Sequence, residues 1–267
     1  MKKILQLLSG LNGSSLVRGL RLGPHEFLSA SQASHAAAHP FESPESLKQK
    51  RIKDALNAIP NMELRDLLDA TLGDKRAVMT FDLSRYEDGL MPVNDALALL
   101  ALLVAENPNE VLEIGTYMGY TTRAMAQNLP KATIHTVDLP PDFSASSSSD
   151  PDMPKDDFHL IGRRVVGREF KGQAVENRIR QHFGDTAKIN FQEFGKPTFF
   201  FVDGSHTYEY CKQDSEKCFA LSGGSGVFLW HDCDEWHPGV IKFLLEWRAA
   251  GRNIRRIAGT SLAYWKV

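Results

Sequence analysis

The sequence lacks the features that define several large classes of protein. Its 267 residues include only 3 cysteines, too few for a disulfide framework, so we expect reduced thiols and a cytoplasmic protein. No apolar run approaches the roughly 18 residues of a membrane span. The 31 basic and 33 acidic residues nearly cancel, to a net charge of −2, which gives no general attraction for phosphate backbones. Neither nucleic acid nor a membrane is therefore an expected partner.

The chain divides by composition near residue 90. Residues 1–90 contain a charged helical pattern over 46–72 and no strand alternation, which predicts a helical N-terminal extension. Its first apolar residues could begin a secretory signal, but Ser9 and Gly10 interrupt them, which favours a short amphipathic helix or a frayed end. Helical extensions can mediate dimers, so a homodimer is one assembly to expect. Residues 91–267 are expected to form the main domain.

The main domain alternates predicted helices and strands. Helices are expected over 96–105, 121–128, 175–183, 208–221 and 240–249, the first with Asn94 as its N-cap. Strands are expected over 110–114, 132–138, 189–191, 198–202, 226–230, 253–258 and 262–266. This order predicts an α/β fold with a doubly wound, mostly parallel, seven-stranded Rossmann-like sheet that closes with an antiparallel hairpin.

Residues 140–172 interrupt the alternation. Pro140 and Pro141 precede a serine run over 144–149, a composition typical of a mobile, lid-like insertion. The insertion carries the basic side chains Arg163, Arg164, Arg168 and Lys171. They either close over an acidic acceptor or form a solvated face, and charge runs more commonly do the latter.

Polar residues gather where the predicted parallel strands end, the edge at which such sheets bind ligands. Strand 110–114 leads into a turn with Gly115 and Gly119, where a backbone without side chains can approach a ligand closely. Tyr117 stands where a dinucleotide fingerprint has its second glycine, which disfavours a pyrophosphate site. The next strand ends at Asp138, whose carboxylate either accepts hydrogen bonds from ribose hydroxyls or is a solvated cap.

These motifs resemble a known family. The E-x-G-x-x-x-G form from Glu113 to Gly119 is similar to the first motif of class I S-adenosylmethionine-dependent methyltransferases, and Gly184-Asp185-Thr186 is similar to their adenine-contacting turn. The pattern D-G-x-H-x-Y-E from Asp203 to Glu209, followed by His231-Asp232, resembles the cephalosporin hydroxylase-like and natural-product or sugar O-methyltransferases. The resemblance extends from about residue 81 to residue 236.

The resemblance implies an O-methyltransferase (EC 2.1.1.-) that binds S-adenosylmethionine. Its acceptor would be a hydroxyl of a small molecule or a glycan, methylated by in-line displacement. The cofactor-binding residues that it implies are Glu113, Gly115, Thr116, Tyr117, Gly119, Asp138, Asp185, Thr186 and Asp203.

A metal ion is a further implication, because some relatives hold magnesium with acids at two of these strand ends. By position the ligands would be Asp203 and Asp232, with His231 where those relatives have an acid. This histidine leaves open magnesium, manganese, a softer ion such as zinc or iron, and no metal at all.

A hydroxyl acceptor must lose its proton, and an imidazole is suited to accept it. We expect His206 to be the base, with His231 second and Asp203 beside them, although His206 could instead cap the helix that begins near Tyr208. The aromatic residues Tyr208, Trp230 and Trp236 either shape the acceptor pocket or fill the core. Cys211, Cys218 and Cys233 could be combined with His231 and His237 into a zinc site, but their spacing matches no zinc motif, so they are expected to be packing thiols.

Two other functions remain open from the sequence. A nicotinamide-dependent oxidoreductase on a related fold is disfavoured by Tyr117 and by the closing hairpin. A non-catalytic Rossmann-like binding module is disfavoured by the intact polar residues Glu113, Gly115, Asp138 and Asp203.

Overall fold

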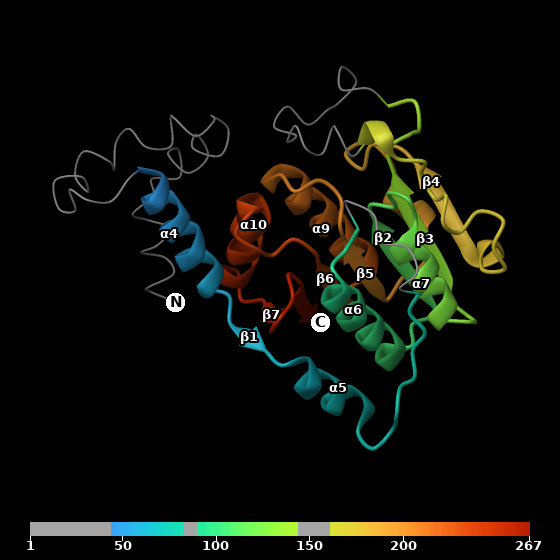
Figure 1. Cartoon of the computed structure of the whole chain (residues 1–267), viewed down its shortest axis with the longest axis horizontal. Coiled ribbons are helices and arrows are strands. Elements are labelled where there is room, and N and C mark those ends of the chain that lie inside the picture. Colours follow the sequence, from blue (N-terminus) through green and yellow to red (C-terminus); the bar gives the residue numbers. More distant parts are fainter. Residues whose placement is uncertain (1–43, 83–89, 144–160) are drawn as a thin grey trace.

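The computed structural model describes residues 44–82, 90–143 and 161–267 (Figure 1). The start of the predicted extension and residues 144–160 of the predicted lid lie outside the described residues. In chain order the elements are α4 Pro44–Asn57, β1 Asn61–Met62, α5 Leu64–Leu72, α6 Val93–Glu106, β2 Glu110–Ile114, α7 Tyr120–Asn128, β3 Thr133–Asp138, η2 Glu176–Arg178, β4 Ile179–Phe183, η3 Phe191–Phe194, β5 Phe199–Val202, α9 Tyr208–Ser222, β6 Val227–Trp230, α10 Pro238–Ala249, β7 Arg255–Ile257 and β8 Ala263–Lys266.

The strands form one eight-stranded sheet in the order β1-β7-β8-β6-β5-β2-β3-β4. Strand β8 runs antiparallel to both of its neighbours, β6 and β7, and the other pairs are parallel. The predicted mixed, doubly wound fold is thus confirmed. The strand order reverses at β2, with β3 and β4 on one side and β5 and β6 on the other, and ligands bind at such a reversal.

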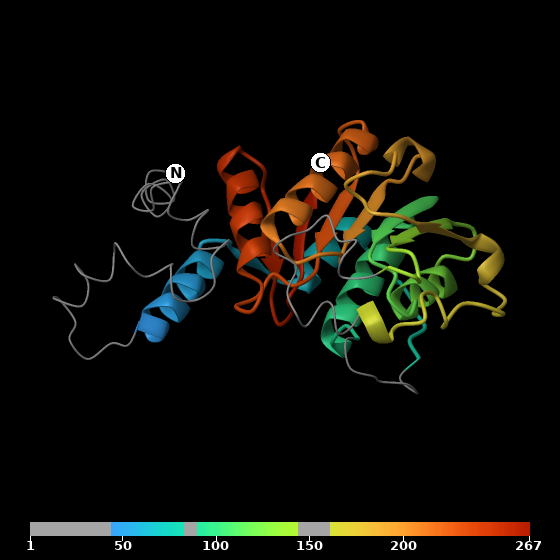
Figure 2. The same cartoon turned by 90° about the horizontal axis from the view of Figure 1, so that it is seen from above.

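Both faces of the sheet are buried, which explains the uninterrupted apolar runs of its central strands. Phe200 of β5 packs with residues of α4, α9 and α10, whereas Phe199 and Phe201 pack with residues of α5, α6 and α7. Figure 2 shows the helices on the two sides of the sheet. The three cysteines are buried free thiols, as predicted: Cys211, Cys218 and Cys233.

Three local predictions are wrong. Residues 175–183 form a short 3₁₀ turn and then β4, an edge strand whose half-exposed polar residues hide its strand character. Residues 189–191 are no strand, because the Ile189 N–H donates to the Asp185 carbonyl at 3.1 Å and the Asn190 side chain accepts from the Gln192 N–H at 3.1 Å to begin η3. Helix α6 has Pro92, and not Asn94, at its N-cap.

The described part of the extension belongs to the same fold. Its helical pattern divides at Pro60, which has no amide hydrogen for a helix. The following residues, Asn61 and Met62, pair with β7 and add the eighth strand, which the sequence did not predict. Ile59 is fully buried in the core beside α10. Among the described residues, no helix is both long enough and apolar enough to cross a membrane.

Candidate active site

A cavity of about 380 Å³ opens at the carboxyl ends of β2, β3, β5 and β6. It brings together most residues that the sequence predicted for the site: Gly115, Thr116, Tyr117, Gly119, Asp138, Asp185, Thr186, Asp203, His206, His231 and Asp232. Glu113 is the predicted residue that does not line it. The reversal of strand order and the motif residues therefore coincide.

The turn after β2 is held against the loop after β5. Gly115 has a φ of +98°, and a Cβ atom there would lie 1.9 Å from the Asp203 carbonyl oxygen, so only glycine fits. Tyr117 is also left-handed, with a φ of +50°, and its N–H donates to Asp138 Oδ2 at 2.7 Å. The turn thereby aims its backbone at the end of β3.

Glu113 lies beneath this turn and is fully buried. Its Oε2 accepts hydrogen bonds from the hydroxyls of Thr122 at 2.5 Å and Thr136 at 2.6 Å, which join α7 and β3 to β2. Burial raises the pKa of Glu113 to about 8, although both hydrogen bonds lower it. The carboxyl group therefore positions the cofactor turn without lining the cavity.

Asp138 faces the cavity and is paired with Arg164 of the insertion. Arg164 Nη2 lies 2.8 Å from Asp138 Oδ1 and also donates to the Leu139 carbonyl at 3.1 Å. The Arg164 side chain is only 3% exposed, so the predicted solvated face does not describe this residue. Burial raises the pKa of Asp138, and the guanidinium partly offsets that effect. The carboxylate accepts a hydrogen bond from the Tyr117 N–H at Oδ2 and one from Arg164 at Oδ1, and the Leu139 N–H also bonds to it.

The predicted adenine turn lies farther along the cavity. Asp185 Oδ1 accepts from the Tyr210 hydroxyl at 3.0 Å and from the Ala187 N–H at 2.9 Å. Beside it lies Asp214, which the sequence analysis missed because it is one acid within a helical pattern. Burial raises the pKa of Asp214 to about 7, and its Oδ1 has no hydrogen-bond partner within the described ranges.

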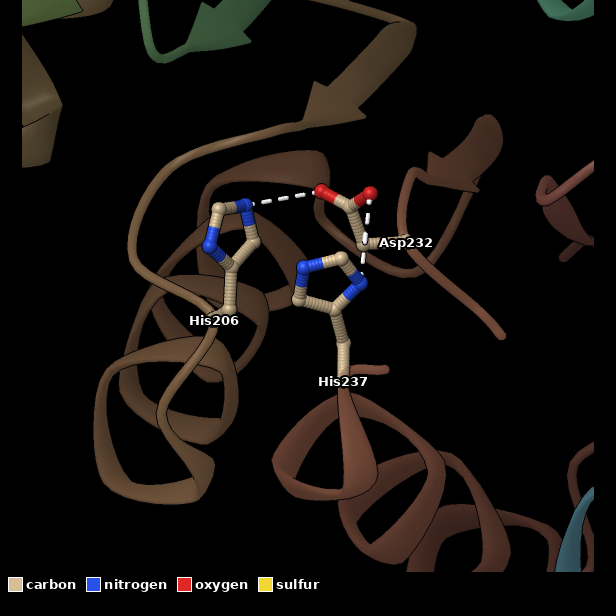
Figure 3. Close-up of side chains that lie close together, drawn as sticks. All are labelled: His206, Asp232 and His237. Carbon is tan, nitrogen blue, oxygen red and sulfur yellow. Dashed lines mark ion pairs between the residues drawn. The ribbon is translucent and has the colours of Figure 1, made fainter. Parts of the chain in front are cut away.

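Two imidazoles flank Asp232 at the other end of the cavity (Figure 3). His206 Nε2 lies 2.7 Å from Asp232 Oδ2, and His237 Nδ1 lies 3.4 Å from Asp232 Oδ1. Burial opposes ionisation of Asp232, but the hydrogen bonds from His206 and His231 outweigh it and hold its pKa well below the usual range. His206 does not cap α9, since the N-cap is Thr207. The predicted alternative, in which His206 caps this helix, is therefore wrong.

His231 is held between carboxylates on both sides. Its Nδ1 lies 3.1 Å from Asp203 Oδ1, and its Nε2 lies 3.1 Å from Asp95 Oδ2. Burial lowers the pKa of His231, but the carboxylate of Asp203 and its neighbours raise it well above its ordinary value. Asp95 is buried in α6 and accepts from the Ser261 N–H at 3.2 Å. Asp95 and Ser261 belong to no motif, so nothing in the sequence marks them as part of the site.

Within the part of the chain that the structure describes, two groups of three side chains could hold a metal ion, and both contain Asp232. One comprises Asp203, His231 and Asp232, as predicted; the other comprises His206, Asp232 and His237, and within each group the ligand atoms lie within 4.8 Å of one another. Magnesium prefers an octahedral set of oxygen ligands, whereas both groups mix carboxylate with imidazole. Their chemistry therefore fits manganese, zinc or iron better than magnesium.

The three predicted pocket aromatics lie elsewhere. Trp230 is fully buried in the core, Trp236 is 82% exposed, and the Tyr208 hydroxyl donates to Glu246. None of them lines the cavity, whose aromatic residues are Tyr117, Tyr120, Phe143 and Tyr210.

The sequence of this chain is similar to those of known methyltransferases. Residues 112–233 match a family model described as a methyltransferase domain. Catechol O-methyltransferase B of Danio rerio is 33% identical over 130 residues, which cover 43% of this chain and 44% of that protein, so the chain matches less than half of its length.

Solved structures of methyltransferases also align with the chain. The O-methyltransferase TomG of Streptomyces achromogenes, in complex with SAM, is 15% identical with a TM-score of 0.47, over 77% of this chain and 99% of that chain. The SAH-bound Podospora anserina methyltransferase PaMTH1 is 17% identical with a TM-score of 0.46, over 76% and 95%. The family match over residues 112–233 and the likeness to a catechol O-methyltransferase confirm the predicted resemblance of this chain to methyltransferases.

Proposed function

We propose that this protein is an S-adenosylmethionine-dependent O-methyltransferase whose acceptor is a hydroxyl of a small molecule or a glycan. The main support for the proposal is the position of Asp138 at the end of β3. Its carboxylate accepts hydrogen bonds from Tyr117 and Arg164 and lines the same cavity as the imidazoles. The family match and the likeness to a catechol O-methyltransferase support it. A cytoplasmic location and a homodimer remain predictions from the sequence.

The cavity offers acceptors for an adenosine moiety. The Asp138 carboxylate lines the cavity at the end of β3, where it can accept hydrogen bonds from ribose hydroxyls. Asp185, Thr186 and Asp214 line the part of the cavity proposed for adenine. Gly115, Thr116 and the turn that they begin complete the wall.

The imidazoles supply the acid–base chemistry. When bound, S-adenosylmethionine supplies a methyl group whose bond to sulfur breaks as its bond to the acceptor oxygen forms, which leaves S-adenosylhomocysteine. In the metal-free protein His206 accepts the hydroxyl proton, and Asp232, 2.7 Å from its Nε2, stabilises the resulting imidazolium. His231 is less suited to this role, because both of its ring nitrogens already face carboxylates.

A divalent metal ion at Asp232 is part of the proposal. Such an ion would lower the pKa of an acceptor hydroxyl bound to it. The residues that would hold it are Asp203, His231 and Asp232, or else His206, Asp232 and His237.

The proposal is tested by isothermal titration of S-adenosylmethionine and S-adenosylhomocysteine into the wild type, Asp138→Ala and Asp142→Ala. Asp142 is a nearby exposed aspartate that does not line the cavity. We expect micromolar binding to the wild type and to Asp142→Ala, and at least about a tenfold weaker Kd for Asp138→Ala, a difference of about 1.4 kcal/mol. Absence of binding to the wild type would overturn the proposal, and binding of NADH in its place would favour the oxidoreductase.

A further inference from the structure

Two histidines that lie just before α9 and α10 converge on one carboxylate (Figure 3). The ring centroids of His206 and His237 lie 4.5 Å apart. His206 approaches Oδ2 of Asp232, and His237 approaches Oδ1, so the two imidazoles use different oxygens. His237 belongs to no motif recognised in the sequence, and its side chain lines the cavity together with the other two.

The backbone of the two helix starts brings these rings together. Gly239, in the first turn of α10, lies so close to the start of α9 that a Cβ atom would be 2.5 Å from the His206 carbonyl oxygen and 2.7 Å from the Tyr208 nitrogen. A residue with a side chain would separate the two helices. Glycine at this position therefore allows His237 to reach the carboxylate that His206 contacts.

Asp232 itself has an unusual backbone conformation. Its φ of +58° is left-handed, which is unfavourable for a residue with a Cβ atom and is found more commonly at functional sites. Asp232 is the second residue after β6, and its conformation directs the carboxylate between the two imidazoles. An aspartate held in this way is preorganised to bind a third group together with the histidines.

We propose that His206, Asp232 and His237 form a binding site for a divalent transition metal ion of the zinc, cobalt or manganese class. Two imidazole nitrogens and one carboxylate oxygen are a donor set for these ions, and three protein ligands leave further coordination positions open toward the cavity. The inference rests on the proposed function only in that it concerns the same cavity. With the ion bound, His206 would be a ligand and not the proton acceptor. The ion would lower the pKa of an acceptor hydroxyl bound to it, and the proton would pass to water.

This ligand set is favoured over the one that contains His231. The His206 and His237 side chains are 21% and 27% exposed, whereas the His231 side chain is 10% exposed and faces carboxylates at both ring nitrogens. An ion would therefore have to displace more contacts at His231. At His237 it displaces one, because Nδ1 lies 2.9 Å from Asp234 Oδ1.

The test is a titration of Co²⁺ into EDTA-treated full-length protein, followed by the visible d–d absorption of the bound ion. The variants are His237→Gln, which affects only the proposed set, Asp203→Asn, which affects only the competing set, and Asp232→Asn, which affects both. His182→Gln is the matched control, since His182 stacks on His135 outside the cavity. We expect the wild type, Asp203→Asn and His182→Gln to bind alike, His237→Gln to bind at least about tenfold more weakly, and Asp232→Asn not to bind.

Loss of binding in Asp203→Asn with His237→Gln unchanged would overturn the proposal and assign the ion to the competing set. Equal weak binding by every variant would also overturn it, as adventitious cobalt only. Circular dichroism of the same samples reports that each variant is folded. Titration of S-adenosylmethionine into the wild type separates the two ideas, because a protein that binds S-adenosylmethionine but not Co²⁺ refutes the metal site alone.

Discussion

Burial determines what each acidic residue of the cofactor motifs does. Glu113 and Asp138 were both predicted to contact the cofactor, but Glu113 is inaccessible and bonded to two threonine hydroxyls. Asp138 lies at the cavity wall, where Arg164 balances its charge. The spacing of a motif identifies both residues, whereas the packing around them assigns one to the scaffold and the other to the ligand.

Glu113→Gln should change how stability depends on pH. The pKa of Glu113 is about 8 in the folded protein against 4.5 as the ordinary value, so the folded state keeps a proton that the unfolded state releases between these pH values. This proton stabilises the folded state fully below a pH of about 4.5, and the stabilisation is lost as the pH rises to about 8. We therefore expect the free energy of unfolding of the variant, relative to that of the wild type, to rise by on the order of 3 kcal/mol between about pH 5 and about pH 8. Urea unfolding at the two pH values measures it. A difference that stays constant between the two pH values would contradict a proton held by Glu113.

Close backbone contacts between neighbouring loops build the site at the scale of elements. Gly115 brings the turn after β2 onto the loop after β5, and Gly239 brings α10 onto the start of α9. Both contacts join segments that contribute polar residues to one cavity. The geometry of the cavity therefore depends on positions that carry no functional group.

Gly115→Ala should remove cofactor binding and destabilise the protein. The new methyl group would overlap the Asp203 carbonyl oxygen, and alanine also disfavours a φ of +98°. Gly172→Ala is the matched control, because Gly172 is also left-handed, with a φ of +73°, and nothing lies within 4 Å of a Cβ atom there. We expect the control to lose about 1 kcal/mol of stability with unchanged S-adenosylmethionine affinity, and Gly115→Ala to lose more than about 2 kcal/mol and to bind poorly. Equal effects in unfolding and calorimetry would show that the clash does not matter.

The elements that the sequence predicts well are those with both faces buried. Strands β2, β3, β5 and β6 are apolar runs ended by polar residues, and their positions were predicted to within one residue. Strands β1 and β4 lie at the two edges of the sheet and expose polar side chains, so their sequences have no apolar pattern to detect. Prediction failed where the pairing partner, and not the strand's own composition, defines the strand.

At the scale of the whole molecule, some residues of the site could be predicted from the sequence and others could not. Residues at strand ends were predicted because parallel strands bring their carboxyl ends to one edge. The contacts that Asp95, Arg164 and His237 make with these residues were not predicted, since each comes from a helix, an insertion or a loop that only the tertiary structure brings to the cavity. Local spacing contains no information about such contacts.

The described part of the extension should unfold together with the main domain. Ile59 is fully buried in the core that also contains residues of α9 and α10, so Ile59→Ala creates a cavity in the shared core. We expect a loss of about 3 kcal/mol in the free energy of unfolding and one transition by circular dichroism and tryptophan fluorescence. Val78→Ala, at a residue that is 87% exposed, should change stability little. Two separate transitions for Ile59→Ala would indicate that the extension is an independent unit.

The segment that matches the methyltransferase domain is not a transplantable module. It ends at residue 233, whereas the Nε2 partner of His231 comes from Asp95, before the segment, and His237 lies beyond its end. A chimaera that grafted residues 112–233 onto a related scaffold would carry the carboxylates without these partners. Engineering of this fold must therefore exchange the flanking helices α6 and α10 together with the motifs that lie between them.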